Sequence, residues 1–378
     1  MRTLVTGATG YIGSRLVAAL LGEGHHVIVG SRNLERLGEF GWIDDVTPVL
    51  LDAGDPESAS SAFGVAGPID VVYYLVHGIG QPGFRDADNL AAANVARAAT
   101  AAGVKRIVYL GGFVPDDGEL SEHLASRAEV AEALTIDGGP EVVWLGAAII
   151  LGAGSTSFEL LRYVGDRFLL IPMPPWAHNA LDPISISDVL YYLVVAADAE
   201  RVPAGSYDIR GPETTTYGDL LLTYARLSGK WRAGVPMPDV DIGLVSQVAA
   251  LFVPVPGGLA ADLVKSLDHP MTASNDGLRS LVSDPPGGLV SLEDAIRLSL
   301  SSQRTLPVDR LADPHHLADT DPDWAGGDVA RLRKLAAMVT PSHARPALGL
   351  LGAVPGPVAG WWRTGLDTLI GLGPKGTS

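Results

Sequence analysis

Six short apolar runs punctuate the first 150 residues, and polar turns followed by helix-forming stretches separate them. Apolar runs of this length are typical of strands that helices cover on both faces. The predicted strands are residues 2–6, 26–30, 46–51, 71–75, 106–111 and 142–148. The predicted helices between them are residues 11–21, 34–39, 56–63, 86–102 and 122–134. This alternation predicts an α/β fold with a doubly wound parallel sheet.

The pattern loosens after Gly152, where helices are expected over residues 186–197, 217–228 and 291–300. We expect three parts in total. They are a sheet core over residues 1–155, the remaining core elements with a small, mainly helical lobe over 156–302, and an extended arm over 303–378. Proline, aspartate and histidine interrupt the arm repeatedly. Trp361 and Trp362 near its end could dock on the body, contact a partner protein or touch a membrane surface.

Composition narrows the classes of function. The 378 residues carry a formal net charge of −16, and no cluster of Lys and Arg occurs, which argues against nucleic acid as a partner. The absence of cysteine excludes disulfides and thiolate chemistry. Because the chain runs directly into a strand and no apolar stretch is long enough to span a bilayer, we expect no signal peptide and no transmembrane segment. The expected compartment is the cytoplasm.

A glycine-rich loop joins the first strand to the first helix. It consists of Gly7, Ala8, Thr9, Gly10, Tyr11, Ile12 and Gly13. In such a loop the first glycine permits a tight turn, the second lets the backbone approach a pyrophosphate, and the third lets the helix pack on the sheet. The free N–H groups and the helix dipole then bind the pyrophosphate. Because the loop directly follows a predicted strand and opens a predicted helix, its glycine spacing indicates a dinucleotide-binding motif.

The end of the second strand bears on the choice between the two nicotinamide dinucleotides. An acidic residue there would bind the ribose hydroxyls of NAD, but this chain has Ser31 and Arg32. Arg32 can pair with a 2′-phosphate and Ser31 can hydrogen-bond it, which favours NADP while leaving NAD possible. The alternative is that Arg32 is a solvated residue in the turn before a helix.

Two further strand ends belong to the same predicted edge. Asp52 follows the third strand and is placed to meet the adenine, although it is also a turn-forming residue. Leu75, Val76 and His77 follow the fourth strand, where backbone would pass under the adenosine ribose. His77 is the first titratable side chain at the edge where open α/β sheets bind ligands.

Metal and hydrolase chemistry find no support. The acidic triplet at Asp319, Asp321 and Asp323 starts like a calcium loop, but Trp324 stands where the loop needs glycine. The nine histidines form no zinc-binding pattern, and the chain has no nucleophile elbow and no Walker loop. We therefore expect no metal site.

With the glycine loop, five later segments resemble the atypical branch of the short-chain dehydrogenase/reductase superfamily, close to NmrA-like bacterial NAD(P)H-binding proteins. These segments are residues 73–77, 149–155, 183–189, 211–213 and 321–327. The resemblance covers roughly residues 1–327 and implies a Rossmann domain with a cofactor-closing lobe. Longer members carry an extra C-terminal domain, and residues 360–367 resemble its beginning.

The resemblance also implies a catalytic Ser and a Tyr-x-x-x-Lys pair, and this chain departs from both. Gly111 and Gly112 stand at the serine positions, His123 stands about where the tyrosine is expected, and Arg127 takes the place of the lysine. Histidine can act as an acid near neutral pH, but a neighbouring arginine disfavours its charged form. Arg127 can still bind ribose or phosphate, and Gly111 would line the cofactor. His123 and Arg127 could equally be exposed residues of a helix.

Two classes of function therefore stay open. In the first, the protein is an NADPH-dependent oxidoreductase of a small-molecule substrate, in which water, His123 or His77 handles the proton and the acceptor resembles a quinone. In the second, it is a non-catalytic NADP(H)-binding redox sensor, regulator or assembly factor. A closed, roomy cavity at the nicotinamide end would favour the enzyme.

Overall fold

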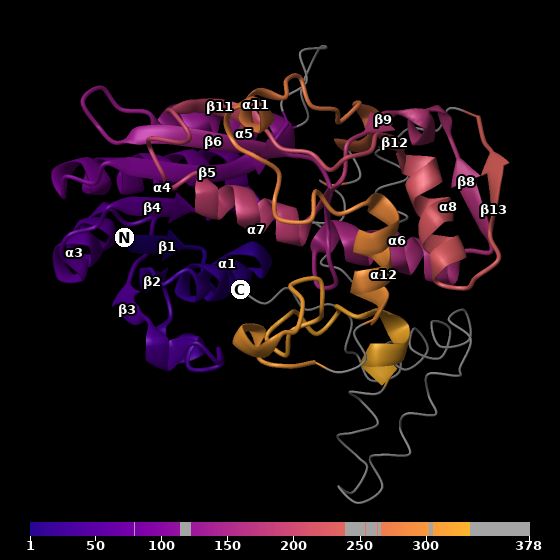
Figure 1. Ribbon diagram of the computed structural model, residues 1–378, viewed down its shortest axis with the longest axis horizontal. Coiled ribbons are helices and arrows are strands. Elements are labelled where there is room, and N and C mark those ends of the chain that lie inside the picture. Colours follow the sequence, from indigo (N-terminus) through magenta and orange to yellow (C-terminus); the bar gives the residue numbers. More distant parts are fainter. Residues whose placement is uncertain are drawn as a thin grey trace, which may run out of the picture.

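The computed structural model describes residues 1–78, 80–113, 122–238, 254, 263, 266–301 and 305–332, with backbone alone at Glu122 and His123. Figure 1 shows two parts of the molecule. The sheet with its flanking helices lies at the left of the picture, and a second group of helices and short strands lies at the right. Trp361, Trp362 and the rest of 333–378 lie outside the described residues, as do 239–253, 255–262 and 264–265 of the predicted lobe.

A seven-stranded parallel sheet forms the core, in the order β11-β6-β5-β4-β1-β2-β3. Its strands are β1 Arg2–Thr6, β2 His26–Ser31, β3 Thr47–Leu50, β4 Val71–Tyr74, β5 Arg106–Gly112, β6 Glu141–Ala147 and β11 Gly205–Asp208. The order reverses between β1 and β4, which makes the carboxyl ends of these two strands the expected ligand edge. The doubly wound α/β fold predicted from the sequence is confirmed, and the predicted strand ends are shifted by two residues at most.

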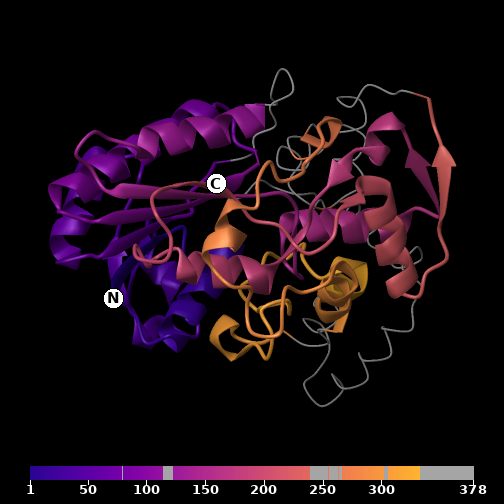
Figure 2. The same cartoon turned by 45° about the horizontal axis from the view of Figure 1, so that its top comes forward.

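Helices cover both faces of the sheet (Figures 1 and 2). On one face pack α1 Tyr11–Gly22 and α7 Ile186–Val195, and on the other pack α3 Pro56–Ala66, α4 Phe84–Ala101 and α5 Glu122–Leu134. Successive strand residues point to opposite faces, so Val5 joins the first core cluster and Leu4 the second. The short helix α2 Leu34–Leu37 and the 3₁₀ turn η1 Ile43–Asp45 lead from β2 to β3.

The second part of the molecule adds three two-stranded sheets and several helices. The sheets pair β7 Ile150–Leu151 with β10 Ile184–Ser185, β8 Leu170–Met173 with β13 Ala233–Pro236, and β9 Ala180–Leu181 with β12 Thr215–Thr216. The helices are α6 Thr156–Arg167, α8 Tyr217–Leu227, α11 Gly277–Leu281 and α12 Leu292–Ser301, with 3₁₀ turns η2 Pro175–His178 and η3 Ser266–Asp268. A helical C-terminal part is thus present. The domain boundaries proposed from sequence stay predictions.

The described part of the arm, residues 305–332, returns to the sheet core (Figure 1, orange to yellow). Its 3₁₀ turn η4 Val308–Arg310 contacts α1, and Val308 is buried in the same core cluster as α1. We call residues 313–328 the strap, because this segment crosses from α1 to α6. Among the residues the structure describes, no helix is both long and apolar enough to cross a membrane.

Candidate functional site

The glycine loop occupies the turn between β1 and α1, and two of its glycines are required by close contacts. Gly7 has a φ of +72°, and a Cβ there would lie 2.5 Å from the carbonyl oxygen of Leu75. A Cβ on Gly13 would lie 2.2 Å from the carbonyl oxygen of Gly7. Any side chain at either position would push the loop outward. The geometry matches the roles predicted for the first and third glycines.

The amino end of α1 is open. Its N-cap residue is Gly10, which supplies no side-chain hydrogen bond to the first turn. Solvent exposure varies along the glycine loop, since Ala8 is fully buried and Gly10 is exposed. The first-turn N–H groups therefore have no side-chain acceptor from the N-cap, and they lie at the positive end of the helix dipole. This is the arrangement that binds a pyrophosphate.

At the end of β2 the two predicted phosphate contacts differ in availability. The Arg32 side chain is exposed and makes no hydrogen bond or ion pair with any described residue. Ser31 donates its hydroxyl hydrogen to the carbonyl of Asn33 and accepts the Asn33 N–H, at 2.9 and 3.1 Å. Since a serine has one hydrogen to donate, Ser31 is occupied by this turn and Arg32 is the free group.

Asp52 also takes part in a local turn. Its carboxylate accepts the N–H of Gly54 at 3.0 Å, and its own N–H donates to the Ser58 hydroxyl at 2.9 Å. One carboxylate oxygen makes the turn, so the other keeps its capacity to accept hydrogen bonds. The adenine contact predicted for Asp52 stays a prediction.

The segment after β4 passes directly under the glycine loop. The Thr6 hydroxyl donates to the carbonyl of Tyr73 and lies 3.4 Å from the N–H of Leu75, which joins the ends of β1 and β4. Val76 is half-buried and His77 exposed. Although part of the His77 ring faces solvent, the protein around it and the charge on Arg127 both lower its pKa. The lowered pKa keeps the imidazole neutral at pH 7 and makes it a weak base, so it has no imidazolium proton to give and little tendency to take one up.

Arg127 lies on α5 with its guanidinium among the groups of this edge. Its backbone carbonyl accepts the hydroxyl of Tyr109 at 3.2 Å, and its charge acts on His77 and on buried Asp88. Burial raises the pKa of Asp88, while Arg127 and the N–H of Gly78 oppose that rise. The Arg127 side chain also hydrogen-bonds to the Tyr109 side chain, and together with its charge this opposes the rise in the pKa of Tyr109 that burial causes. The charge on Arg127 thus acts on His77 at this edge, whereas the His123 side chain lies outside the described residues, and the cofactor contacts of these residues stay predictions.

The two glycines at the end of β5 have different surroundings. A Cβ on Gly111 would lie 2.5 Å from Nε1 of Trp144 and 3.0 Å from the ring of Tyr109. A Cβ on Gly112 would have its nearest neighbours at 3.8 Å, among them Cγ of Arg127. The indole of Trp144 therefore leaves no room for a side chain at Gly111, whereas a Cβ at Gly112 would make only ordinary van der Waals contacts. The described residues contain no group of three or more acidic or histidine side chains that could hold a metal ion.

Comparison with protein families agrees with this geometry. Residues 7–135 match a family model described as NAD(P)H-binding. These residues contain the glycine loop, β4 and the whole of α5. This part of the chain therefore matches an NAD(P)H-binding domain. The resemblance inferred from sequence is confirmed at this level.

Two curated proteins show the range of relatives. The mitochondrial NADH dehydrogenase [ubiquinone] 1 alpha subcomplex subunit 9 of Arabidopsis thaliana is 23% identical over 290 residues, which is 74% of this chain and 70% of that protein. A 3-diazoavenalumate denitrifying reductase of a Streptomyces species is 43% identical over 75 residues, which is 20% of this chain and 23% of the reductase.

Solved structures share the fold at low identity. A nucleoside-diphosphate-sugar epimerase from Staphylococcus aureus superposes with a TM-score of 0.63 at 18% identity, over 79% of this chain and 100% of the epimerase. A Bordetella bronchiseptica enzyme in complex with NAD⁺ gives a TM-score of 0.58 at 16% identity, over 78% of this chain and 96% of the other. The similarity extends well beyond the residues of the family model, so the C-terminal part also has the architecture of this fold.

Proposed function

We propose that this protein is an NADP(H)-dependent oxidoreductase whose hydride acceptor needs little help from an acid. The observation that carries the proposal is the set of positive groups at one sheet edge. These groups are the uncapped amino end of α1, the exposed Arg32 side chain, and the Arg127 side chain, whose charge acts on His77. Three positive elements at one edge suit a dinucleotide with an additional 2′-phosphate.

The class of hydride acceptor is inferred from the lack of a strong proton donor at this sheet edge. Neutral His77 has no imidazolium proton to supply, and the Arg127 guanidinium is a poor proton donor. Gly111 cannot carry the hydroxyl that polarises a carbonyl, because Trp144 fills that space. Quinone-like acceptors suit such a site, since they accept hydride without a strong acid. The curated relatives have names of the same class, a ubiquinone-linked NADH dehydrogenase subunit and a reductase.

The second candidate is a non-catalytic NADP(H) sensor or assembly factor, and the absent Ser, Tyr and Lys groups favour it. One series of measurements separates the two. NADPH and NADH are titrated against the protein by fluorescence, and absorbance at 340 nm is then followed with quinones and aldehydes. NADPH binding that Arg32→Ala weakens about tenfold, roughly 1.4 kcal/mol, supports the cofactor assignment. Equal or tighter NADH binding would refute it.

Turnover then decides between enzyme and sensor. Consumption of NADPH with a quinone and not with an aldehyde is the result expected of the proposed enzyme. Binding without turnover of any acceptor would favour the sensor. Matched variants His77→Gln and His123→Gln test the remaining proton carriers, because glutamine keeps the hydrogen-bonding capacity of the ring and cannot shuttle a proton at neutral pH.

A further inference from the structure

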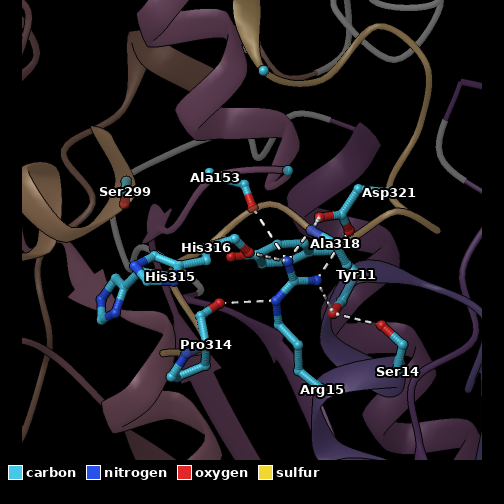
Figure 3. Close-up of polar contacts among 12 residues, drawn as sticks. Tyr11, Ser14, Arg15, Ala153, Ser299, Pro314, His315, His316, Ala318 and Asp321 are labelled. Atoms are coloured by element: carbon cyan, nitrogen blue, oxygen red, sulfur yellow. Dashed lines mark hydrogen bonds and ion pairs between the residues drawn. The ribbon is translucent and has the colours of Figure 1, made fainter. Parts of the chain in front are cut away.

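Arg15 lies on α1 one turn beyond the glycine loop and is almost completely buried, with 1% of its side chain exposed. Figure 3 shows its guanidinium at the centre of a ring of acceptors. It donates to both carboxylate oxygens of Asp321 at 3.0 and 2.8 Å. It also donates to four backbone carbonyls, those of Tyr11, Ala153, Pro314 and His316. One side chain of the cofactor helix thus ties that helix to the strap.

The same guanidinium contacts the glycine loop itself. It lies 4.0 Å from the centre of the Tyr11 ring, and it reaches the Tyr11 carbonyl at 3.2 Å. The Tyr11 hydroxyl is buried without a hydrogen-bond partner, and burial raises its pKa. On its far side, a Cβ on Gly152 would lie 2.0 Å from that hydroxyl. Tyr11 is therefore held between Arg15 and Gly152, and it begins the helix whose free N–H groups face the pyrophosphate space.

Polar contacts hold most of the strap in place. Asp321 also accepts the N–H of Ala318 at 2.7 Å, and Glu159 accepts the N–H of Gly326 at 2.9 Å. At the far end, Asp328 pairs with Arg167 of α6. The apolar share is a small cluster, made of Ala153, Leu317, Trp324 and Ala325, together with Ala318, which is buried in the same core cluster as α1. The charged contact between the strap and α1 is the Arg15–Asp321 pair, and loss of either partner would leave the other charge buried and unpaired.

We propose that Arg15 and Asp321 are positioning residues for the glycine loop, and that docking of the strap and binding of the dinucleotide strengthen each other. The proposal rests on the NADP(H) binding proposed above. The cofactor takes the accessible side of the loop, and the strap takes the buried side through Tyr11. The dinucleotide and the strap both order the backbone of the glycine loop. Whichever of them binds first therefore lowers the conformational entropy that the loop loses when the other binds. Linkage requires the two effects to be equal in size.

The experiment compares two charge-removing variants of the strap in the full chain. Asp321→Asn neutralises the partner of Arg15 on the cofactor helix. Asp328→Asn neutralises the partner of Arg167 on α6, in a pair whose side chains are 14% and 1% exposed. NADPH affinity is measured by fluorescence titration, and amide hydrogen exchange in residues 313–328 is measured with and without NADPH. Unfolding in urea gives the stability of each variant.

We expect NADPH to slow exchange in the strap of the wild-type protein about tenfold, within the usual range of coupling between sites. Asp321→Asn should raise the Kd for NADPH by about the same factor and abolish the slowing. Asp328→Asn should change the Kd less than about twofold, even at an equal loss of stability. If Asp321→Asn does not fold, Arg15→Lys serves in its place. It keeps the charge but loses the fork of donors that reaches several carbonyls, and should weaken NADPH binding in the same way.

Other results would overturn the proposal in distinguishable ways. Unchanged affinity in Asp321→Asn, or equal losses in both variants, would show that the pair has only a structural role. NADPH binding by the wild-type protein without slower exchange in the strap would refute the coupling and leave the cofactor assignment intact. Failure of the wild-type protein to bind either dinucleotide would refute the proposed function, and with it the coupling.

Discussion

The sheet and the strap are both well buried, but different forces hold them. In the sheet, Val5, Val29 and Tyr73 are fully buried among other apolar side chains. In the strap, Asp321, Asp328 and His315 are buried, and each is paired with a charged or polar partner. Transfer of apolar surface and close packing stabilise the first region, while matched charges and hydrogen bonds stabilise the second. The sheet should therefore respond to changes of volume and the strap to changes of charge.

The largest effect is expected at the Arg15–Asp321 pair. Arg15→Leu leaves a buried carboxylate without its cation, and should lower the free energy of unfolding by about 3–5 kcal/mol. Asp321→Leu should cost a similar amount for the converse reason. The double variant should lose far less than the sum, because it leaves neither charge unpaired. Urea unfolding of the three proteins measures these differences, and additive losses would show that the pair is not a unit.

A smaller change in stability, this time a gain, is expected from a substitution where α7 meets the C-terminal part. Asp188 accepts the N–H of Val290 at 3.0 Å, and burial raises its pKa from 3.8 to about 6. Below about pH 4 the group is protonated in both folded and unfolded chains. As the pH rises towards 6, the unfolded chain releases its proton first, so the stability contributed by the protonated group is lost.

Asp188→Asn keeps an acceptor for Val290 and removes the charge. It should therefore raise stability at pH 7 by about 2–3 kcal/mol, following the size of the pKa shift, and change it little at pH 4. Urea unfolding of both proteins at the two pH values tests this. A variant that is less stable than the wild-type protein at pH 7 would mean that the ionised carboxylate is a net stabiliser.

The smallest effect is expected at the end of β5, where only volume changes. Gly111→Ser places a Cβ against Trp144 and should cost about 1–3 kcal/mol by overpacking. A Cβ in Gly112→Ser meets its nearest neighbours at 3.8 Å, an ordinary contact distance, and the change should alter stability by less than about 1 kcal/mol. Thermal unfolding of the two variants, at low and at high salt, measures the difference in their stability. Equal costs at both positions would contradict the packing described around Trp144.

Much of the sheet could be predicted because its signals are local. Short apolar runs fall at each strand, and the helix predicted over residues 122–134 has the bounds of α5. The glycine loop could be recognised because its spacing has a single physical purpose at a strand–helix junction. The small strands β8, β9, β12 and β13 were not predicted. Pairs of two to four residues bury too little surface to leave a pattern.

The rest of the site depends on contacts that no local pattern contains. In the sequence Asp321 belongs to an acidic triplet and to the family-like segment 321–327, and nothing near Arg15 marks it as its partner 306 residues away. Sequence also placed Ser31 beside a phosphate, although the hydroxyl is engaged by Asn33. The obstruction at Gly111 comes from Trp144 on the neighbouring strand and becomes visible only in the paired sheet. Such information lies in tertiary structure alone.

The Arg15–Asp321 pair also has a consequence for biosynthesis. A ribosome releases the chain from its amino end, so the first strand and helix emerge long before the residue that neutralises Arg15. Until about 300 further residues have been translated, this guanidinium has no carboxylate partner, and of its acceptors only the Tyr11 carbonyl lies on its own helix. Early domains usually fold as they emerge. Here the nascent amino-terminal domain would wait, incompletely assembled, for nearly the whole described chain.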